Sequence, residues 1–243
     1  MITNYFESIF NRLRMTLENE EKNMKKAAEI VAESIRNNGI VYLFGCGHSH
    51  ILTEEVFYRA GGLVPLKPIF HEPLMLHEGA SLSSELERKN DYAVDFMKLQ
   101  DIRPGDVCFV ISTSGRNPVP VDVALLAKEK GATIIGITSR EYSSANPSRH
   151  KSGKHLYDVV DLVIDNYSVK GDAILQHPKV DIPFTATSTV VGATILNSIF
   201  SEAIVKMADS DFEPPIFLSG NLEGSDEHNR ILIKRYKERI PLL

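Results

Sequence analysis

The feature that most constrains the fold of this chain is a pair of apolar runs, each followed by a loop of glycine and hydroxyl residues and then by a helical pattern. The first run covers residues 40–44 and leads into Gly-Cys-Gly-His-Ser at 45–49. The second covers residues 107–111 and leads into Ser-Thr-Ser-Gly at 112–115. Uninterrupted apolar runs of this length are typical of strands that are covered on both faces of a parallel sheet. The chain is therefore predicted to contain βαβ units.

The remaining segments continue the alternation of strand and helix, which predicts an α/β fold with a five-stranded parallel sheet doubly wound into three layers. We expect a helical arm at 1–38, a central domain at 39–210 and a C-terminal extension at 211–243. Residues 165–183 have no regular pattern and are expected to be irregular. The predicted strands are 40–44, 63–70, 107–111, 133–138 and 159–164, and the predicted helices are 4–37, 51–60, 85–100, 118–130, 187–207 and 231–239.

The long N-terminal helix carries an apolar stripe that its own domain has little surface to cover. Phe6, Ile9, Phe10, Leu13 and Leu17 follow the spacing of one helical face. The stripe could pack on the helices that flank the sheet, or it could pair with a second subunit. We favour a homodimer, with a tetramer as the larger alternative.

Composition excludes several classes of function. The net charge is −5, so nothing in the totals favours nucleic acid, and an anion must be bound by local donors. The only cysteines, Cys46 and Cys108, fall in a loop and in a strand, which predicts free thiols and a cytoplasmic location. The first residues lack the pattern of a signal peptide, and the apolar stretches are shorter than the roughly 20 residues of a membrane span.

The two loops predict an anion site. Backbone N–H groups and hydroxyls after a strand, together with the partial positive charge of the next helix, are suited to a phosphate. The first loop lacks the third glycine of the dinucleotide fingerprint, because His50 stands there, and no acidic residue closes the second predicted strand. Neither loop continues as Gly-Lys-Ser/Thr, so a P-loop is excluded. No cofactor is expected.

Three segments in this order resemble the sugar isomerase (SIS) domain family of phosphosugar-binding proteins. They are residues 44–49, residues 111–117 and Thr-Ser-Thr at 187–189, with Asn197 further along the late helix. The resemblance implies a flavodoxin-like five-stranded sheet, a phosphorylated sugar as ligand, and a dimer or tetramer. It places ligand contacts on Gly47, His48, Ser49, Ser112, Thr113, Ser114, Asn117, Ser188 and Thr189. The alternative for each hydroxyl is a helix cap or a local turn, although one cap needs only one hydroxyl.

The catalytic residues do not carry over from the branches of the family. The phosphoheptose isomerase branch has His and Glu on its first crossover helix, where this chain has Glu55 and Arg59. Its late helix has Gln and His, where this chain has Thr189 and Asn197. This departure puts the heptose reaction and its metal in doubt. The late helix is more similar to the N-acetylmuramic acid phosphate etherase branch, which uses paired glutamates as acid and base.

Proton transfer next to a carbonyl needs an acid or base, commonly a carboxylate or histidine. The local candidates are Glu72 and His71, in the loop after the second predicted strand, and Glu55 on the first crossover helix, which follows Ser49. Each could equally be a solvated surface residue. A zinc site of His48, His50 and His71 lacks ligand spacing, and no metal is expected.

The sequence therefore predicts a protein that binds a phosphorylated sugar and catalyses its isomerisation or a related proton transfer. The alternative is a sugar-phosphate sensor without catalysis. A regulator that binds DNA is disfavoured, because only about 40 residues precede the first predicted strand and they contain no basic helix-turn-helix unit.

Overall fold

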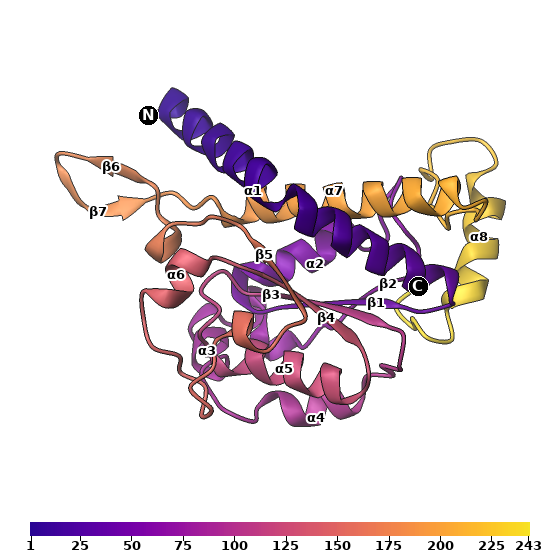
Figure 1. Ribbon diagram of the computed structural model, residues 1–243, viewed down its shortest axis with the longest axis horizontal. Helices are drawn as coiled ribbons and strands as arrows, with labels where there is room; N and C mark the ends of the chain where they lie inside the picture. Colours follow the sequence, from indigo (N-terminus) through magenta and orange to yellow (C-terminus); the bar gives the residue numbers. More distant parts are fainter.

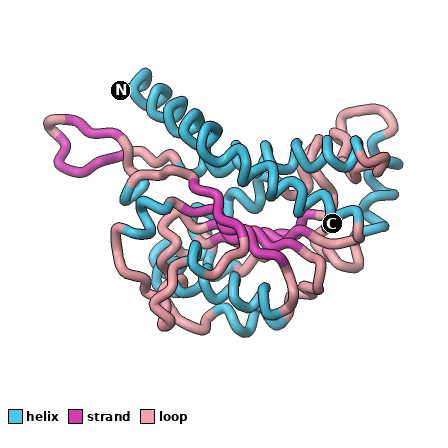
Figure 2. The backbone as a smooth tube through the Cα atoms, viewed as in Figure 1, coloured by secondary structure: helices cyan, strands magenta, loops and turns pink.

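The computed structural model describes all 243 residues and contains a five-stranded parallel sheet with helices on both faces (Figures 1 and 2). This arrangement confirms the α/β, doubly wound prediction. The strand order is β2-β1-β3-β4-β5, as in a flavodoxin-like sheet. The strands are β1 (Val41–Gly45), β2 (Leu66–Pro68), β3 (Val107–Ile111), β4 (Thr133–Thr138) and β5 (Leu162–Asp165).

The direction in which successive strands are added to the sheet reverses after β2, so that β1 and β3 become neighbours. From β1 the chain moves outward to β2, and it then returns to the other side of β1 to form β3. The two strands run side by side from the pair Val41–Val107 to the pair Gly45–Ile111. Ligands of open α/β sheets bind at the carboxyl ends of strands at such a switch point. The fold therefore brings the loops after β1 and β3 together.

Each face of the sheet has its own apolar core. Successive strand residues point to opposite faces, so Val41 and Leu43 belong to one core, and Tyr42 and Phe44 to the other. The first core is closed by α1 (Ile2–Arg36), α2 (Ile51–Val56) and α7 (Ser188–Asp209), and the second by α3 (Ala80–Leu86), α4 (Ala93–Lys98), α5 (Pro118–Glu129) and α8 (Ser225–Tyr236).

Helices α1 and α7 lie side by side over one face of the sheet, and the first half of α1 projects beyond the body of the protein (Figure 1). Helix α7 is the one helix that is long and apolar enough to cross a membrane. Several of its apolar side chains, including Ile199 and Phe200, are buried in the core below α1, which is typical of a core helix.

The C-terminal segment contacts the amino ends of the central strands, opposite to the carboxyl ends that carry the two loops. The Arg239 guanidinium contacts the buried carboxylate of Asp106 at 2.6 Å, just before β3. The same carboxylate accepts a hydrogen bond from the Ile40 N–H at 2.8 Å, just before β1. The last residues therefore secure the amino ends of the strands that carry the two loops.

Several predicted elements differ from the observed ones. Predicted helix 85–100 is broken into α3 and α4, because Asp91 takes a left-handed backbone conformation and donates its N–H to Asp122. The segment 165–183, expected to be irregular, contains the projecting hairpin of β6 (Leu175–His177) and β7 (Val180–Phe184). Predicted strand 63–70 shortens to β2, helix 51–60 shortens to α2, and α8 begins six residues before the predicted start.

Candidate functional site

The loop after β1 turns sharply and leaves one hydroxyl available. A Cβ on Gly45 would lie 2.5 Å from the Ser49 carbonyl oxygen, so only glycine lets this loop fold back on the strand. Gly47 has φ +53°, a left-handed conformation that glycine adopts readily. The Ser49 N–H donates to the Cys46 carbonyl at 2.9 Å, whereas the Ser49 hydroxyl has no partner within the protein. His48 is exposed.

In the loop after β3, two hydroxyls form hydrogen bonds within the protein and a third does not. The buried Ser112 hydroxyl accepts the Gly115 N–H at 3.2 Å and therefore stabilises the turn. Thr113 accepts a hydrogen bond from Asn166 at 3.3 Å. Ser114 is half-buried, and its hydroxyl has no partner within the protein. The free hydroxyls of Ser49 and Ser114 thus follow two adjacent parallel strands.

Gly115 holds the second loop against β4. It has φ +56°, and a Cβ there would lie 2.6 Å from both the Thr138 and the Ser143 hydroxyl oxygens. The Ser143 hydroxyl in turn donates to the Ser114 carbonyl at 2.8 Å. Asn117 then precedes α5, whose N-terminus faces the loop and contributes a partial positive charge.

Glu87, at the end of α3, is a residue of this region that the sequence did not single out. Its carbonyl accepts the N–H of Val119 in the first turn of α5 at 3.3 Å, which fixes it beside the β3 loop. Burial raises the pKa of its carboxyl group, while Asn117 and the nearby Arg88 oppose that shift. The Glu87 charge in turn raises the pKa of Cys46, whose own pKa is raised chiefly by burial. Glu87 therefore lies between the two loops.

The start of α7 is already held by a carboxylate of the same chain. Asp172 accepts the Thr187 N–H at 3.1 Å and the Ser188 N–H at 3.2 Å, and it also accepts the Ser188 hydroxyl. Thr189 is half-buried. Ser188 is thus engaged by Asp172, a contact that no local sequence pattern reveals because the two residues are 16 apart.

The three predicted catalytic side chains have separate surroundings. His71 contacts the Tyr92 hydroxyl at 3.0 Å and stacks on Phe96, and burial lowers its pKa. Glu72 is exposed. Glu55, on α2, pairs with Arg59, which lies beyond the end of that helix, at 3.1 Å. None of the three contacts the Ser112–Ser114 segment, and no group of three or more metal-ligating side chains comes together.

A family model described as the SIS domain matches residues 4–139, more than half of the chain. This chain belongs to the SIS domain family. Among SIS domain proteins it is 68% identical over 243 residues to a UPF0309 protein of Halalkalibacterium halodurans, and it covers 97% of that protein. It is 62% identical over 243 residues to a UPF0309 protein of Listeria innocua, of which it covers 98%. It therefore belongs to the UPF0309 proteins as well.

Two solved structures share the fold of this SIS domain protein. A phosphoheptose isomerase from Neisseria gonorrhoeae aligns with a TM-score of 0.54 at 16% identity, over 86% of this chain and 97% of that one. A phosphoheptose isomerase from Francisella tularensis aligns with a TM-score of 0.55 at 14% identity, over 83% and 95%. The family predicted from the three segments is confirmed by these matches.

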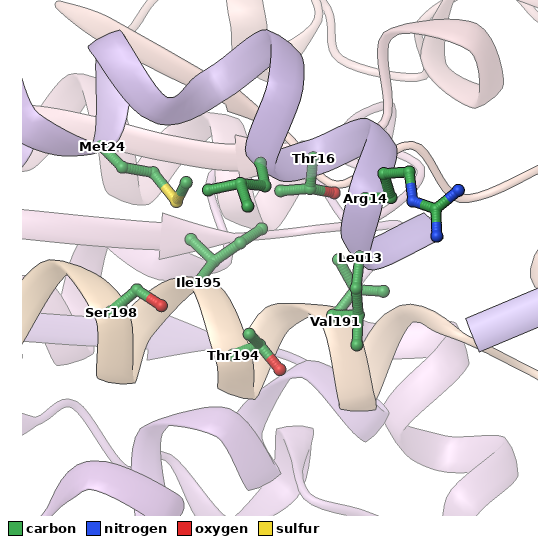
Figure 3. A pocket seen from close by; sticks show the side chains of 9 residues that line it. Leu13, Arg14, Thr16, Met24, Val191, Thr194, Ile195 and Ser198 are labelled. Atoms are coloured by element: carbon green, nitrogen blue, oxygen red, sulfur yellow. The ribbon is translucent and has the colours of Figure 1, made fainter. Parts of the chain in front are cut away.

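A separate cavity of about 350 Å³ lies between α1 and α7 (Figure 3). Met24 and Ile195 extend into it from the two helices, and the buried Thr16 hydroxyl beside it has no hydrogen-bond partner. No residue of the loops after β1 and β3 lines this cavity. It is therefore a feature of the helix pair and not part of the candidate site.

Proposed function

We propose that this protein binds a phosphorylated sugar at the carboxyl ends of β1 and β3. The observation that carries the proposal is the presence of two unpartnered hydroxyls, on Ser49 and Ser114, at the switch point of the sheet. The N-terminus of α5 adds backbone donors and partial positive charge beside them. The phosphosugar chemistry typical of the SIS family agrees with this arrangement.

The reaction that we propose is proton transfer next to the sugar carbonyl, as in aldose–ketose isomerisation. Such a reaction needs a group that takes and returns a proton near neutral pH. Glu87 is suited to this role, since burial raises the pKa of its carboxyl group and it lies between the two loops. Glu72, His71 and Glu55 remain the alternatives predicted from the sequence. Binding without catalysis, as in a sensor, is the second candidate function.

The binding proposal is tested by calorimetric titration with a panel of aldose and ketose phosphates, with NAD and ATP as comparison ligands. Ser49→Ala with Ser114→Ala should weaken sugar-phosphate binding by at least about tenfold, because each lost hydrogen bond to a charged group costs about 1.5–3 kcal/mol. Ser84→Ala is the control, since its exposed hydroxyl bonds only within α3. Unchanged affinity in the double variant would refute the proposed site.

Catalysis is separated from sensing by proton exchange. A sugar phosphate that stabilises the protein is incubated with it in D₂O, and loss of the C2 proton signal is followed by NMR. Exchange that disappears in Glu87→Gln would support the enzyme and this acid–base assignment. Binding without exchange for every stabilising sugar would favour the sensor.

We also propose that the protein is a homodimer through α1. The projecting half of this helix exposes Ile2, Phe6, Phe10 and Leu17, an apolar surface that one copy leaves uncovered. A two-fold pair of such helices would cover both stripes at once. The free and buried thiols of Cys46 and Cys108 agree with a proposed cytoplasmic location.

A further inference from the structure

Three arginines lie near the loop after β3, and none of them forms an ion pair with a carboxylate. Arg116 directly follows Gly115, and Arg149 comes from the loop after α6 (Arg140–Ser144). The Arg149 N–H donates to the Arg116 carbonyl at 2.8 Å, so the two residues lie side by side. Arg88 follows Glu87 at the end of α3. We call Arg88, Arg116 and Arg149 the arginine cluster.

The side chains of two members of the cluster, Arg116 and Arg149, bond to neutral oxygens. Arg116 donates to the Pro147 carbonyl at 3.2 Å, and Arg149 donates to the Asn117 amide oxygen at 2.9 Å. Burial lowers the pKa of Arg149, and the nearby charges of Arg116 and Arg88 lower it further. The charge of Glu87 and the nearby Tyr142 oppose this lowering of the Arg149 pKa. In a chain of net charge −5, the result is a local excess of positive charge next to the two loops.

The loop that carries Arg149 is fixed in position. The buried ring of His150 contacts the Asp122 carboxylate on α5 at 2.9 Å. The Lys151 N–H donates to Asn90 at 2.8 Å, and the Leu156 N–H donates to the Gly115 carbonyl at 2.8 Å. The loop is thus joined to α5, to the α3–α4 connection and to the β3 loop itself. Such anchoring holds the guanidinium in place before any ligand arrives.

We infer that the arginine cluster forms a second anion subsite, and that the physiological ligand is a sugar phosphate with a further anionic group. This inference rests on the proposed function, because the Ser49–Ser114 site holds the phosphoryl group. Guanidinium forks bind carboxylate and phosphate oxygens in pairs, so either group fits the cluster. Asn117 contacts Arg149 and lies next to Glu87, and the second anion would therefore reach the cluster beside the proposed acid–base group.

The test compares matched ligands by calorimetric titration: glucose 6-phosphate, its acid 6-phosphogluconate, and the pair fructose 6-phosphate and fructose 1,6-bisphosphate. The wild-type protein should bind at least one of the ligands with two anionic groups more than tenfold tighter than its matched ligand with one. Preference for the acid identifies a carboxylate as the second group, and preference for the bisphosphate identifies a phosphate. Arg149→Gln and, separately, Arg116→Gln should each reduce that preference to less than threefold while keeping the affinity for the sugar phosphate that has no second anionic group.

The control is Arg36→Gln, which removes one exposed positive charge at the end of α1 and should leave the preference intact. A wild-type protein that binds sugar phosphates with less than threefold preference overturns the inference and leaves the proposed function standing. A preference that survives in both arginine variants also overturns it. Failure of every sugar phosphate to bind would overturn the inference and the proposed function together.

Discussion

Gly115 shows how strongly one backbone position can determine the site. Its φ of +56° and the two hydroxyl oxygens 2.6 Å from a Cβ leave no room for a side chain. Gly115→Ala should therefore displace the β3 loop, lower stability by about 2 kcal/mol or more and weaken sugar-phosphate binding at least tenfold. Urea unfolding and calorimetric titration measure the two effects.

The matched control is Gly153→Ala. Gly153 also has a positive φ, +73°, but a Cβ there would meet nothing within 4 Å. That variant carries only the backbone strain, about 1 kcal/mol, and should bind ligand normally. Equal loss of affinity in both variants would show that the close packing at Gly115 does not matter for binding.

Glu87 gives a prediction for the pH dependence of stability. Burial raises its pKa above the ordinary 4.5, so the folded protein holds this proton more tightly than the unfolded chain does. The stabilisation contributed by the protonated carboxyl is present below pH 4.5 and is lost as the pH rises through the folded-state pKa. Glu87→Gln should thus match the wild type in acid and be the more stable protein at pH 7, by about 1.4 kcal/mol for each unit of raised pKa.

Urea midpoints from pH 4 to pH 8 check this prediction. Glu85→Gln on the same helix is the control, because Glu85 is exposed and pairs only with Lys89 at the surface. Taking the difference between variant and wild type cancels the contributions of the other buried carboxylates. A difference that does not change with pH would mean that Glu87 is no more buried than an ordinary surface acid.

At the scale of the elements, the central strands were predictable because burial on both faces imposes a continuous apolar run. Strands β1, β3 and β4 were predicted to within one residue at each end. The hairpin of β6 and β7 was not, since it projects from the body, where burial imposes no continuous apolar run, and Pro183 interrupts the short alternation of Val180, Ile182 and Phe184. The break between α3 and α4 depends on a tertiary contact of Asp91 with Asp122, which local sequence cannot reveal.

The positions of the two loops were predictable for the same reason as the central strands. Loops that follow central strands can be found from those strands, so the positions of Ser49 and Ser114 after β1 and β3 were predictable, whereas their contact with a ligand stays a prediction. Glu87 was missed because its proximity to the β3 loop is created by the packing of α3 on α5. The roles predicted for Ser188, Thr189 and the other ligand contacts stay predictions, as do the three catalytic candidates and the boundaries at 38 and 210.

The contact between Asp172 and α7 gives a prediction at the element scale. This carboxylate accepts the N–H of Thr187, just before the helix, and the N–H of Ser188, its first residue, a capping arrangement that also complements the helix dipole. Asp172→Ala should lower the free energy of unfolding by about 1–2 kcal/mol, measured by urea unfolding. Asp181→Ala at the exposed hairpin should change it by less than about 0.5 kcal/mol. Equal effects would mean that the cap does not stabilise α7.

At the scale of the whole molecule, the two ends of α1 have different environments. From Ala27 to Ile35 the helix is buried against α7 and the sheet, whereas Phe6 and Phe10 are each 57% exposed. Hydrogen bonds from Tyr5 to the Ala186 carbonyl and from Arg12 to the Tyr167 carbonyl still hold the projecting half in place. A fixed and exposed apolar surface of this kind is suited to a second copy of the chain.

Phe6→Ser with Phe10→Ser should therefore produce a folded monomer where the wild type is a dimer in sedimentation equilibrium. Burial of one phenylalanine contributes about 2 kcal/mol, and each dimer would bury four, so its dissociation constant should rise more than about a thousandfold. Leu99→Ser is the control, because Leu99 is 83% exposed and directly follows α4, away from the arm. The two phenylalanines lie outside the apolar cores. The variant should therefore have the same unfolding midpoint as the wild type when both are measured at a concentration at which the wild type is monomeric. A wild type that sediments as a monomer at tens of micromolar would refute the pairing through α1, and a dimer that persists in the double variant would place the interface elsewhere.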